Sequence, residues 1–497
     1  MKYVLTGEQA KEADLFTINE RKIPAKELMK KAGFKMYEVL KRYINKQDSV
    51  LIVCGAGNNG GDGYVLGSFL YENGFDVSIF QYKTPKTSEA IAAYSEFNGK
   101  IIKEINKNYD VVVDAIFGVG LSRDLDDITK NFISFLNKMS GFKVSLDIPS
   151  GLDSTNGNIM GNAFVCDLLI TVQCLKSGLF LNKGVTTFEK VEIVDIGIDT
   201  SCVIDKLIIY EDEDFQDILQ KRSKICNKGT FGKVALVGGS HDLCGAAILS
   251  ASALASLRCG VGYSRICVPE KLYDIYALKN PENIYFAFKS DDKGNILFDE
   301  ENLRSILNYD CIGVGMGLGC SENVYNICRY LLENYTGNLV LDADALNSIS
   351  AYNSDILSHH KCNLVITPHI KEFSRLTKLS VDEILKKELS FARFFAKKRD
   401  LTLVLKSNTT IICNSQNCVL NITGNPSLAK GGSGDILTGI IVGLLSFTSN
   451  KFLSSCFGPY LLGKCAESIC YKIDERSVIA TDIANEIGYV LKNIKDK

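Results

Sequence analysis

Residues 49–63 read SVLIVCGAGNNGGDG, an apolar, β-branched run that ends in a glycine-rich segment. Such a run is typical of a strand that is buried on both faces of a parallel sheet. The glycines predict a tight turn into a helix, whose first N–H groups and positive dipole end suit a phosphate. The segment has neither the ordinary dinucleotide spacing G-x-G-x-x-G nor the Gly-Lys-Ser/Thr of a Walker A loop. Its two Asn and one Asp offer oxygen ligands of the kind that a hard cation takes.

Similar apolar runs alternate with helical stretches along the chain, which predicts βαβ units and a largely parallel sheet. In the first half we expect a helix at residues 62–73 and strands at 49–54, 76–81, 110–115, 142–147 and 168–173. The pattern breaks at four acidic residues, 211–214, and then resumes. In the second half we expect strands at 233–237, 263–268, 311–314, 339–341, 364–367, 401–405 and 409–413. The sequence therefore predicts two α/β domains, residues 1–207 and 208–497.

The composition is that of an ordinary globular protein. Of the 497 residues 46% are apolar and 23% charged, which excludes a mostly disordered chain. Lys and Arg total 56 against 58 Asp and Glu, so we expect no nucleic-acid partner and no anionic membrane surface. The longest uncharged stretches have about 15 residues, fewer than the roughly 20 of a spanning helix. The 17 Cys form no C-x-x-C pair and no signal peptide is visible, so we expect free thiols in a cytoplasmic protein.

Two carboxylates close later strands of the first half. Asp114 ends the run DVVVD, and Asp147 ends the run SLD. Because the carboxyl ends of parallel strands line the ligand crevice, we expect both beside the glycine-rich turn. A carboxylate that closes an apolar strand is costly to bury unpaired, so each should have a metal, a ligand or a hydrogen-bond partner.

Three segments, GAGNNGGDG (55–63), DAIFGVGL (114–121) and SLDIPSGLD (145–153), together resemble the NAD(P)H-hydrate epimerase family. The resemblance implies a Rossmann-like three-layer domain that binds the hydrated nicotinamide dinucleotide and a potassium ion. It implies that Asp147 is the catalytic, substrate-facing carboxylate and that the K⁺ ligands are Asn59, Asp114 and Ser150. The substrate contacts that it implies are Asn58, Asn59, Gly60, Gly61, Asp62, Gly118, Val119, Gly120, Leu121, Ser122, Arg123, Asp124 and Asp147.

A second glycine-rich segment, GNPSLAKGGSGD at residues 424–435, precedes an apolar helix. The N–H groups at the start of that helix form an anion hole. Asp435, beside the hole, can accept a proton from a substrate hydroxyl while the hole holds phosphoryl oxygens. This combination is typical of small-molecule kinases of the ribokinase type.

Together with GVGMGLG (313–319), LDADALN (341–347) and TPH (367–369), this segment resembles the ADP-dependent NAD(P)H-hydrate dehydratase family. The resemblance spans about residues 225–490 and implies a ribokinase-like domain with Asp435 as the catalytic base and ADP bound with Mg²⁺. The substrate contacts that it implies are Ala246, Gly317, His369 and Asp435. The nucleotide contacts that it implies are Lys406, Ser407, Asn408, Thr409, Thr410 and Gly434. The chain departs from the family pattern at Ile370-Lys371, Ser407-Asn408, Lys430 and Ser433.

The two resemblances predict a bifunctional metabolite-repair enzyme. The first domain would interconvert the R and S forms of NAD(P)HX, and the second would dehydrate the S form to NAD(P)H with ADP, releasing AMP and phosphate. The expected partners are these small molecules, and the family resemblance suggests a homo-oligomer. Two alternatives stay open: a vitamin-precursor kinase fused to a dinucleotide-binding regulatory module, and a first half that only senses dinucleotides or binds a protein.

Overall fold

The computed structural model describes residues 1–121, 123–252 and 255–496. They form two compact units, which we call the N-terminal unit (Tyr3–Leu207) and the C-terminal unit (Ile208–Lys497 together with Met1–Lys2). Both are α/β units built on mainly parallel sheets, as the alternating pattern predicted. Within the described ranges, no helix is long and apolar enough to cross a bilayer.

The N-terminal unit contains a seven-stranded parallel sheet with the strand order β4-β3-β2-β5-β6-β7-β9. Its strands are β2 (Ser49–Cys54), β3 (Asp76–Gln81), β4 (Lys100–Ile102), β5 (Val111–Ala115), β6 (Phe142–Leu146), β7 (Cys166–Val172) and β9 (Phe188–Val194). A short parallel pair joins β1 (Lys2–Leu5) to β8 (Leu175–Lys176). The strand order reverses between β2 and β5, and such a reversal places a ligand crevice at the carboxyl ends of these two strands.

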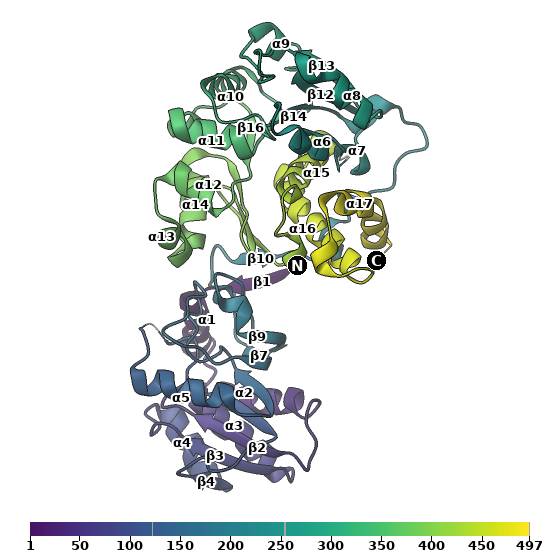
Figure 1. Ribbon diagram of the computed structural model, residues 1–497. Coiled ribbons are helices and arrows are strands. Elements are labelled where there is room, and N and C mark those ends of the chain that lie inside the picture. The colour runs from purple at the N-terminus through teal and green to yellow at the C-terminus, as the bar shows by residue number, and fades with distance from the viewer. Residues whose placement is uncertain (122, 253–254, 497) are drawn as a thin grey trace. The chain divides into compact units, whose positions relative to one another are not determined.

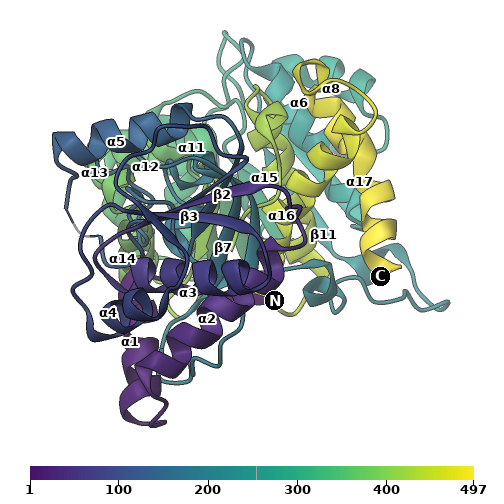
Figure 2. The ribbon, with the colours of Figure 1, turned by 90° about the horizontal axis from the view of Figure 1, so that it is seen from below.

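Helices cover both faces of this sheet. They are α1 (Gly7–Asn19), α2 (Ala25–Leu40), α3 (Asn58–Glu72), α4 (Ser88–Glu96) and α5 (Asp127–Lys138), with 3₁₀ turns η1 (Ser177–Leu179) and η2 (Gly184–Thr186). Figure 2 shows α5 on one face and α2, α3 and α4 on the other. Residues 50–54 of β2 are fully buried between the two layers. The expected three-layer α/β architecture is therefore confirmed for this unit.

Helix α3 begins earlier than predicted. It was expected from residue 62, but Gly57 is its N-cap and Asn58 its first residue. The polar and glycine residues after Asn58 therefore belong to the first turns of the helix rather than to a loop. Glycine is required at position 60, because a Cβ there would lie 2.2 Å from the carbonyl oxygen of Gly55.

The C-terminal unit has the strand order β13-β12-β11-β14-β15-β16-β17-β18-β19-β10. Its strands are β10 (Leu207–Ile209), β11 (Lys233–Val237), β12 (Tyr263–Pro269), β13 (Ile284–Phe288), β14 (Cys311–Val314), β15 (Asn338–Leu341), β16 (Asn363–Ile366), β17 (Thr402–Leu405), β18 (Thr410–Cys413) and β19 (Cys418–Asn421). Pairing is parallel from β13 to β17, antiparallel from β17 to β19, and parallel again between β19 and β10.

Helices also flank this sheet on both sides. They are α6 (Cys244–Ser252), α7 (Ala255–Arg258), α8 (Tyr273–Lys279), α9 (Glu300–Arg304), α10 (Glu322–Asn334), α11 (Ala343–Tyr352), α12 (Ile370–Thr377), α13 (Val381–Lys386), α14 (Glu388–Arg399), α15 (Ser433–Phe447), α16 (Lys451–Cys470) and α17 (Ala480–Lys495). The 3₁₀ turns are η3 (Asp212–Phe215), η4 (Lys228–Phe231), η5 (Glu270–Leu272), η6 (Ser354–Ser358), η7 (Pro426–Leu428) and η8 (Glu475–Ser477). Figure 1 shows α10, α11, α12 and α14 on one side of the strands and α15, α16 and α17 on the other. The apolar helix predicted after Asp435 is α15, which is buried along most of its length.

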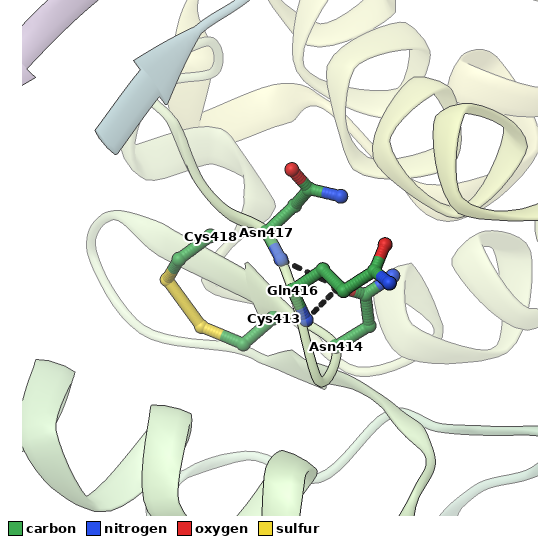
Figure 3. Close-up of a disulfide and its surroundings, with 5 residues drawn as sticks. All are labelled: Cys413, Asn414, Gln416, Asn417 and Cys418. Carbon is green, nitrogen blue, oxygen red and sulfur yellow. Dashed lines mark hydrogen bonds between the residues drawn. A yellow bond between two sulfur atoms is a disulfide. The ribbon is translucent and has the colours of Figure 1, made fainter. Parts of the chain in front are cut away.

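A disulfide joins β18 to β19. Cys413 and Cys418 are directly opposed in the antiparallel pair, with their Cα atoms 4.3 Å apart (Figure 3). The turn between them is closed by the side chain of Asn414, which accepts hydrogen bonds from the N–H groups of Gln416 and Asn417. The expectation that every cysteine is a free thiol is therefore wrong for this pair, because a hairpin turn brings two cysteines of unremarkable spacing face to face.

We expect Phe215 to anchor the start of the C-terminal unit. Its ring is fully buried, with the ring centroids of Phe457 and Tyr460 at 4.5 and 4.8 Å. Phe215→Ala should lower the free energy of unfolding of this unit by about 3–5 kcal/mol, because it leaves a cavity. Ile225→Ala, at a side chain that is 93% exposed, is the control and should change it little. Equal denaturant midpoints for the two variants would contradict this packing.

Candidate active sites

A cavity of about 600 Å³ lies in the N-terminal unit beside the glycine-rich start of α3. Its size is in the range of small-molecule sites. The expected substrate contacts that line it are Asn58, Asn59, Asp62, Gly118, Val119, Gly120, Leu121, Arg123 and Asp147. The cavity therefore brings together residues from the ends of β2, β5 and β6, which lie far apart in the sequence.

Three of the other expected contacts do not line this cavity. Gly60 and Gly61 are closely packed, since a Cβ on Gly61 would lie 2.5 Å from the Met29 side chain and one on Gly60 would meet Gly55. Asp124 is exposed. Ser122 lies outside the described residues.

Asp147 follows β6 in a left-handed backbone conformation, with φ at 65°. Asp tolerates this region better than most residues. Its N–H donates to the carbonyl of Ile170, and its Oδ1 accepts hydrogen bonds from Lys176 Nζ at 2.5 Å and from the Val172 N–H at 3.2 Å. The sequence analysis missed Lys176. The sequence signal that could have drawn attention to it is a lysine directly after apolar Leu175. The structure shows that this lysine is buried.

Two more carboxylates, Asp14 and Asp62, line the same cavity. Burial raises the pKa of Asp62 well above its usual range, and the negative charges of Asp147 and Asp14 add to the shift. Burial and the charge of Asp147 likewise raise the pKa of Asp14. The positive charge of Lys176 acts in the opposite direction on Asp62. The charges of Asp14, Asp62 and Asp147 thus influence one another in the cavity wall, beside the buried ammonium group of Lys176.

The three expected potassium ligands are linked by hydrogen bonds, Asn59 to Phe117, Phe117 to Ser150 and Ser150 to Asp114, and Asn59 also lines the cavity. Asp114 is buried and accepts hydrogen bonds from the hydroxyl of Ser150 at 2.6 Å and from its N–H at 2.8 Å. Burial raises the pKa of Asp114, while these hydrogen bonds oppose the shift. The N–H of Phe117 donates to Ser150 Oγ, and its carbonyl accepts from Asn59 Nδ2.

Asn59 Oδ1 is buried and has no hydrogen-bond partner among the described residues. A buried oxygen without a partner calls for an explanation, and an unrecorded ion is one of them. The neighbouring oxygens come from an amide, a carboxylate and a hydroxyl, which is a donor set for a hard cation. No group of three or more His, Cys, Asp or Glu side chains suited to a metal occurs in the described part of the chain.

The candidate site of the C-terminal unit is centred on the start of α15. Gly432, with φ at 95°, is the N-cap, and Asp435 lies in the first turn. At the end of β15, Asp342 accepts hydrogen bonds from Lys406 Nζ at 2.8 Å and from Thr438 Oγ1 at 2.7 Å. Burial and the charge of Asp342 raise the pKa of Asp435 to about 7, whereas Lys406 acts in the opposite direction. Asp435 can therefore gain or lose a proton near neutral pH.

His369 is the N-cap of α12, where its Nδ1 accepts hydrogen bonds from the N–H groups of Lys371 and Glu372. Burial and the positive charge of Lys406 lower the pKa of His369. The imidazole is therefore neutral, with its proton on Nε2. A backbone bridge pairs His369 with Lys406, so the two lie side by side.

The expected nucleotide contacts lie between β17 and β18. Thr409 is buried, Asn408 is exposed, and Ser407 and Thr410 are half-buried. Gly434 reaches this segment, because a Cβ on it would lie 3.4 Å from Lys406 Nζ. Lys406 therefore lies close to the glycine-rich start of α15.

The remaining expected contacts, Ala246 and Gly317, lie close together. A Cβ on Gly317, which has φ at 67°, would lie 3.0 Å from the Ala246 Cβ. Lys430, which departs from the family pattern, donates to the carbonyl oxygens of Arg476 and Val478. Its ammonium group therefore holds the segment that precedes α17.

Each unit thus has the carboxylates and the helix N-terminus of a small-molecule enzyme at the carboxyl ends of its strands. Residues 234–488 match the family described as NAD(P)H-hydrate dehydratase, and residues 25–178 match that described as YjeF-related protein N-terminus. The bifunctional NAD(P)H-hydrate repair enzyme of Dictyoglomus turgidum is 34% identical over 463 residues, covering 88% of both chains. That of Moorella thermoacetica is 30% identical over 520 aligned positions, covering 100% of this chain and 98% of the relative.

A solved structure supports the fold of the C-terminal unit. The ADP/ATP-dependent NAD(P)H-hydrate dehydratase of Bacillus subtilis, co-crystallised with ATP and Mg²⁺, is 29% identical with a TM-score of 0.50. The match covers 58% of this chain and 99% of that one. The protein belongs to the family of bifunctional NAD(P)H-hydrate repair enzymes. The family resemblance and the ribokinase-like fold predicted from the motifs are thereby confirmed.

Proposed function

We propose that this protein repairs hydrated NADH and NADPH in two steps, epimerisation in the N-terminal unit and nucleotide-dependent dehydration in the C-terminal unit. The observation that carries the proposal is the pairing of two acid sites in one chain of this family. Asp147 faces a small-molecule cavity, and Asp435 stands at a glycine-capped helix N-terminus. The relatives that match across both units favour repair over the alternative of a vitamin-precursor kinase with a regulatory module.

In the epimerase site, Asp147 moves the proton. The hydroxyl on C6 of the hydrated ring leaves as water after it takes a proton, and the lone pair of N1 forms the N1=C6 double bond of an iminium ion. Water then adds to C6 from either face and returns the proton to the carboxylate. Residues of the glycine-rich helix start, Asn58 to Asp62, and of the segment 118–124 bind and orient the dinucleotide.

We assign a potassium ion to Asn59, Asp114 and Ser150. The buried, unpartnered Asn59 Oδ1 supports this assignment, and Asp114 and Ser150 adjoin it through Phe117. The ion supplies positive charge next to the segment that binds the pyrophosphate. The hydrogen bonds among Asn59, Phe117, Ser150 and Asp114 link the chain segments at the ends of β2, β5 and β6.

In the dehydratase site, Asp435 takes the proton of the C6 hydroxyl, which attacks the terminal phosphoryl group of ADP. AMP leaves, and the phosphorylated intermediate then loses phosphate from C6 and a proton from C5, which restores the double bond. The N–H groups at the start of α15 hold the phosphoryl oxygens. Bound Mg²⁺ supplies further charge neutralisation to the nucleotide phosphates. Lys406 to Thr410 and Gly434 contact the nucleotide, and Ala246, Gly317 and His369 contact the hydrated substrate.

The partners that we assign are the small molecules NAD(P)HX and ADP. A homo-oligomer is suggested by the family resemblance, and a cytoplasmic location was expected from the cysteine pattern and the sequence start; both stay predictions.

The epimerase assignment is tested by a coupled absorbance assay on an R/S mixture of NADHX with ADP and Mg²⁺. The unmodified protein should return the whole mixture to NADH. Asp147→Asn should stop after the S fraction apart from slow uncatalysed exchange, because it lacks the proton-transferring carboxylate. Asp127→Asn, whose side chain is 91% exposed, is the control and should give full recovery. Full recovery with Asp147→Asn would refute the role of Asp147.

The dehydratase assignment predicts a pH dependence. Because the pKa of Asp435 is about 7, the carboxyl is protonated and inactive as a base below that pH. The rate with purified S-NADHX should fall about tenfold per pH unit as the pH drops below about 7, and level off above it. Asp435→Asn should bind ADP in calorimetry but lose dehydration, while the exposed Asp382→Asn should behave as the unmodified chain does. Full activity of Asp435→Asn would exclude Asp435 as the base.

The potassium assignment predicts that KCl raises the melting temperature of the N-terminal unit more than choline chloride does at equal ionic strength. Ion binding to the folded state alone stabilises it by mass action. Asn59→Ala should remove this difference, because it deletes the unpartnered oxygen. The exposed Asn73→Ala should keep it. The same response in both variants would argue against Asn59 as a ligand.

A further inference from the structure

Lys176, at the end of β8, is a buried cation in the wall of the epimerase cavity. Its side chain is 3% exposed. Its ammonium group lies 2.5 Å from Asp147 Oδ1, 2.8 Å from the carbonyl oxygen of Val172 and 3.0 Å from Thr171 Oγ1. An ammonium group has three N–H donors, so these three acceptors use all of them. Lys176 therefore has no donor left for a ligand unless one of these bonds breaks.

The contacts of Asp147 are unevenly divided between its two oxygens. Oδ1 accepts from Lys176, from the N–H of Val172 at 3.2 Å and, more weakly, from Thr171 Oγ1 at 3.4 Å. Within the described residues, Oδ2 has no hydrogen-bond partner. Oδ2 lies 3.5 Å from the position that a Cβ on Gly118 would occupy, next to the glycine segment that lines the cavity.

The backbone of Asp147 makes an anchor necessary. With φ at 65° the residue is in the left-handed region, where a short polar side chain readily bonds to nearby backbone groups. Lys176 holds Oδ1 at the end of β7, so the side chain does not turn toward other backbone groups. Two rigid strands, β7 and β8, thus determine the direction of the carboxylate, as a preorganised site requires.

We propose that Lys176 is a positioning residue of the epimerase, which locks Asp147 Oδ1 so that Oδ2 alone exchanges the proton with the C6 oxygen of the substrate. This inference rests on the proposed function. Oδ2 gives its proton to the departing hydroxyl, which leaves as water, and takes one back from the water that adds to C6. Lys176 keeps its three protons throughout and contacts Asp147 rather than the substrate.

The test uses the full chain and compares Lys176→Met with Lys183→Met, whose lysine is exposed and outside the cavity. R-NADHX is supplied with ADP and Mg²⁺, and NADH formation reports epimerisation when dehydration is made fast by excess Asp147→Asn protein. Lys176→Met should lower the kcat of epimerisation about 100-fold and leave KM within about twofold, since binding is unchanged and only orientation is lost. Lys183→Met should match the unmodified chain.

A double-variant cycle separates positioning from a merely structural role. In this cycle no further protein is added, and the C-terminal unit of each variant carries out dehydration. If Lys176 acts through Asp147, adding Lys176→Met to Asp147→Asn should slow the residual rate by less than about twofold. Independent, multiplicative losses would overturn the proposal, and so would an unchanged kcat in Lys176→Met. Lys176→Leu, which also lacks a donor, serves where Lys176→Met does not fold, and a kcat equal to that of the unmodified chain would likewise overturn it.

Chemical rescue gives a second readout. In Lys176→Ala, added ethylamine should restore part of the kcat, because a small ammonium ion can occupy the vacated space beside Oδ1, whereas ethanol should not. Equal effects of ethylamine and ethanol would overturn the proposal. Failure of the unmodified chain to exchange epimers at all would instead refute the proposed function, so the two failures are distinguishable.

Discussion

A buried carboxylate at the end of a parallel strand must be neutralised, and this requirement organises both units. Asp147 is paired with Lys176 at 2.5 Å, and Asp342 is paired with Lys406 at 2.8 Å. Asp114 forms no ion pair with another described residue and accepts hydrogen bonds from Ser145, Ser150 and the N–H of Ile116. An unpaired charge at such a depth would cost several kcal/mol. The residues that supply these partners therefore belong to the sites as much as the carboxylates do.

These paired carboxylates also set the protonation of their neighbours. The charge of Asp147 raises the pKa of Asp62, and the charge of Asp342 raises the pKa of Asp435 to about 7. In both cases burial is the largest cause and a lysine opposes the shift. Each unit thus places a carboxylate paired with a lysine next to a carboxyl group whose pKa is raised. Groups with displaced pKa values of this kind cluster where protons are transferred.

Much of the central fold could be predicted from the sequence. The seven strands expected in the second half all form, with ends within about one residue, because doubly covered strands need continuous apolar runs. The strands that were not expected are β1, β4, β8, β9, β10, β13 and β19. Of these, β4, β9 and β13 lie at the sheet edges, and their exposed positions interrupt the apolar pattern. The start of α3 was misplaced because glycine has low helix propensity, whereas here the approach of Gly60 to the Gly55 carbonyl demands it.

In the candidate sites, too, some residues could be predicted from the sequence and others could not. Motif resemblance singled out Asp147 and Asp435 because these residues lie within short contiguous segments. Lys176 lies in no such segment, and its role follows only from the parallel pairing of β8 with β1 and the proximity of β7. A charge partner is chosen by three-dimensional distance, for which sequence spacing holds no general rule. The pairing of a strand-end carboxylate with its cation is therefore visible only in the structure. In this site, the pairing determines which oxygen of Asp147 transfers the proton.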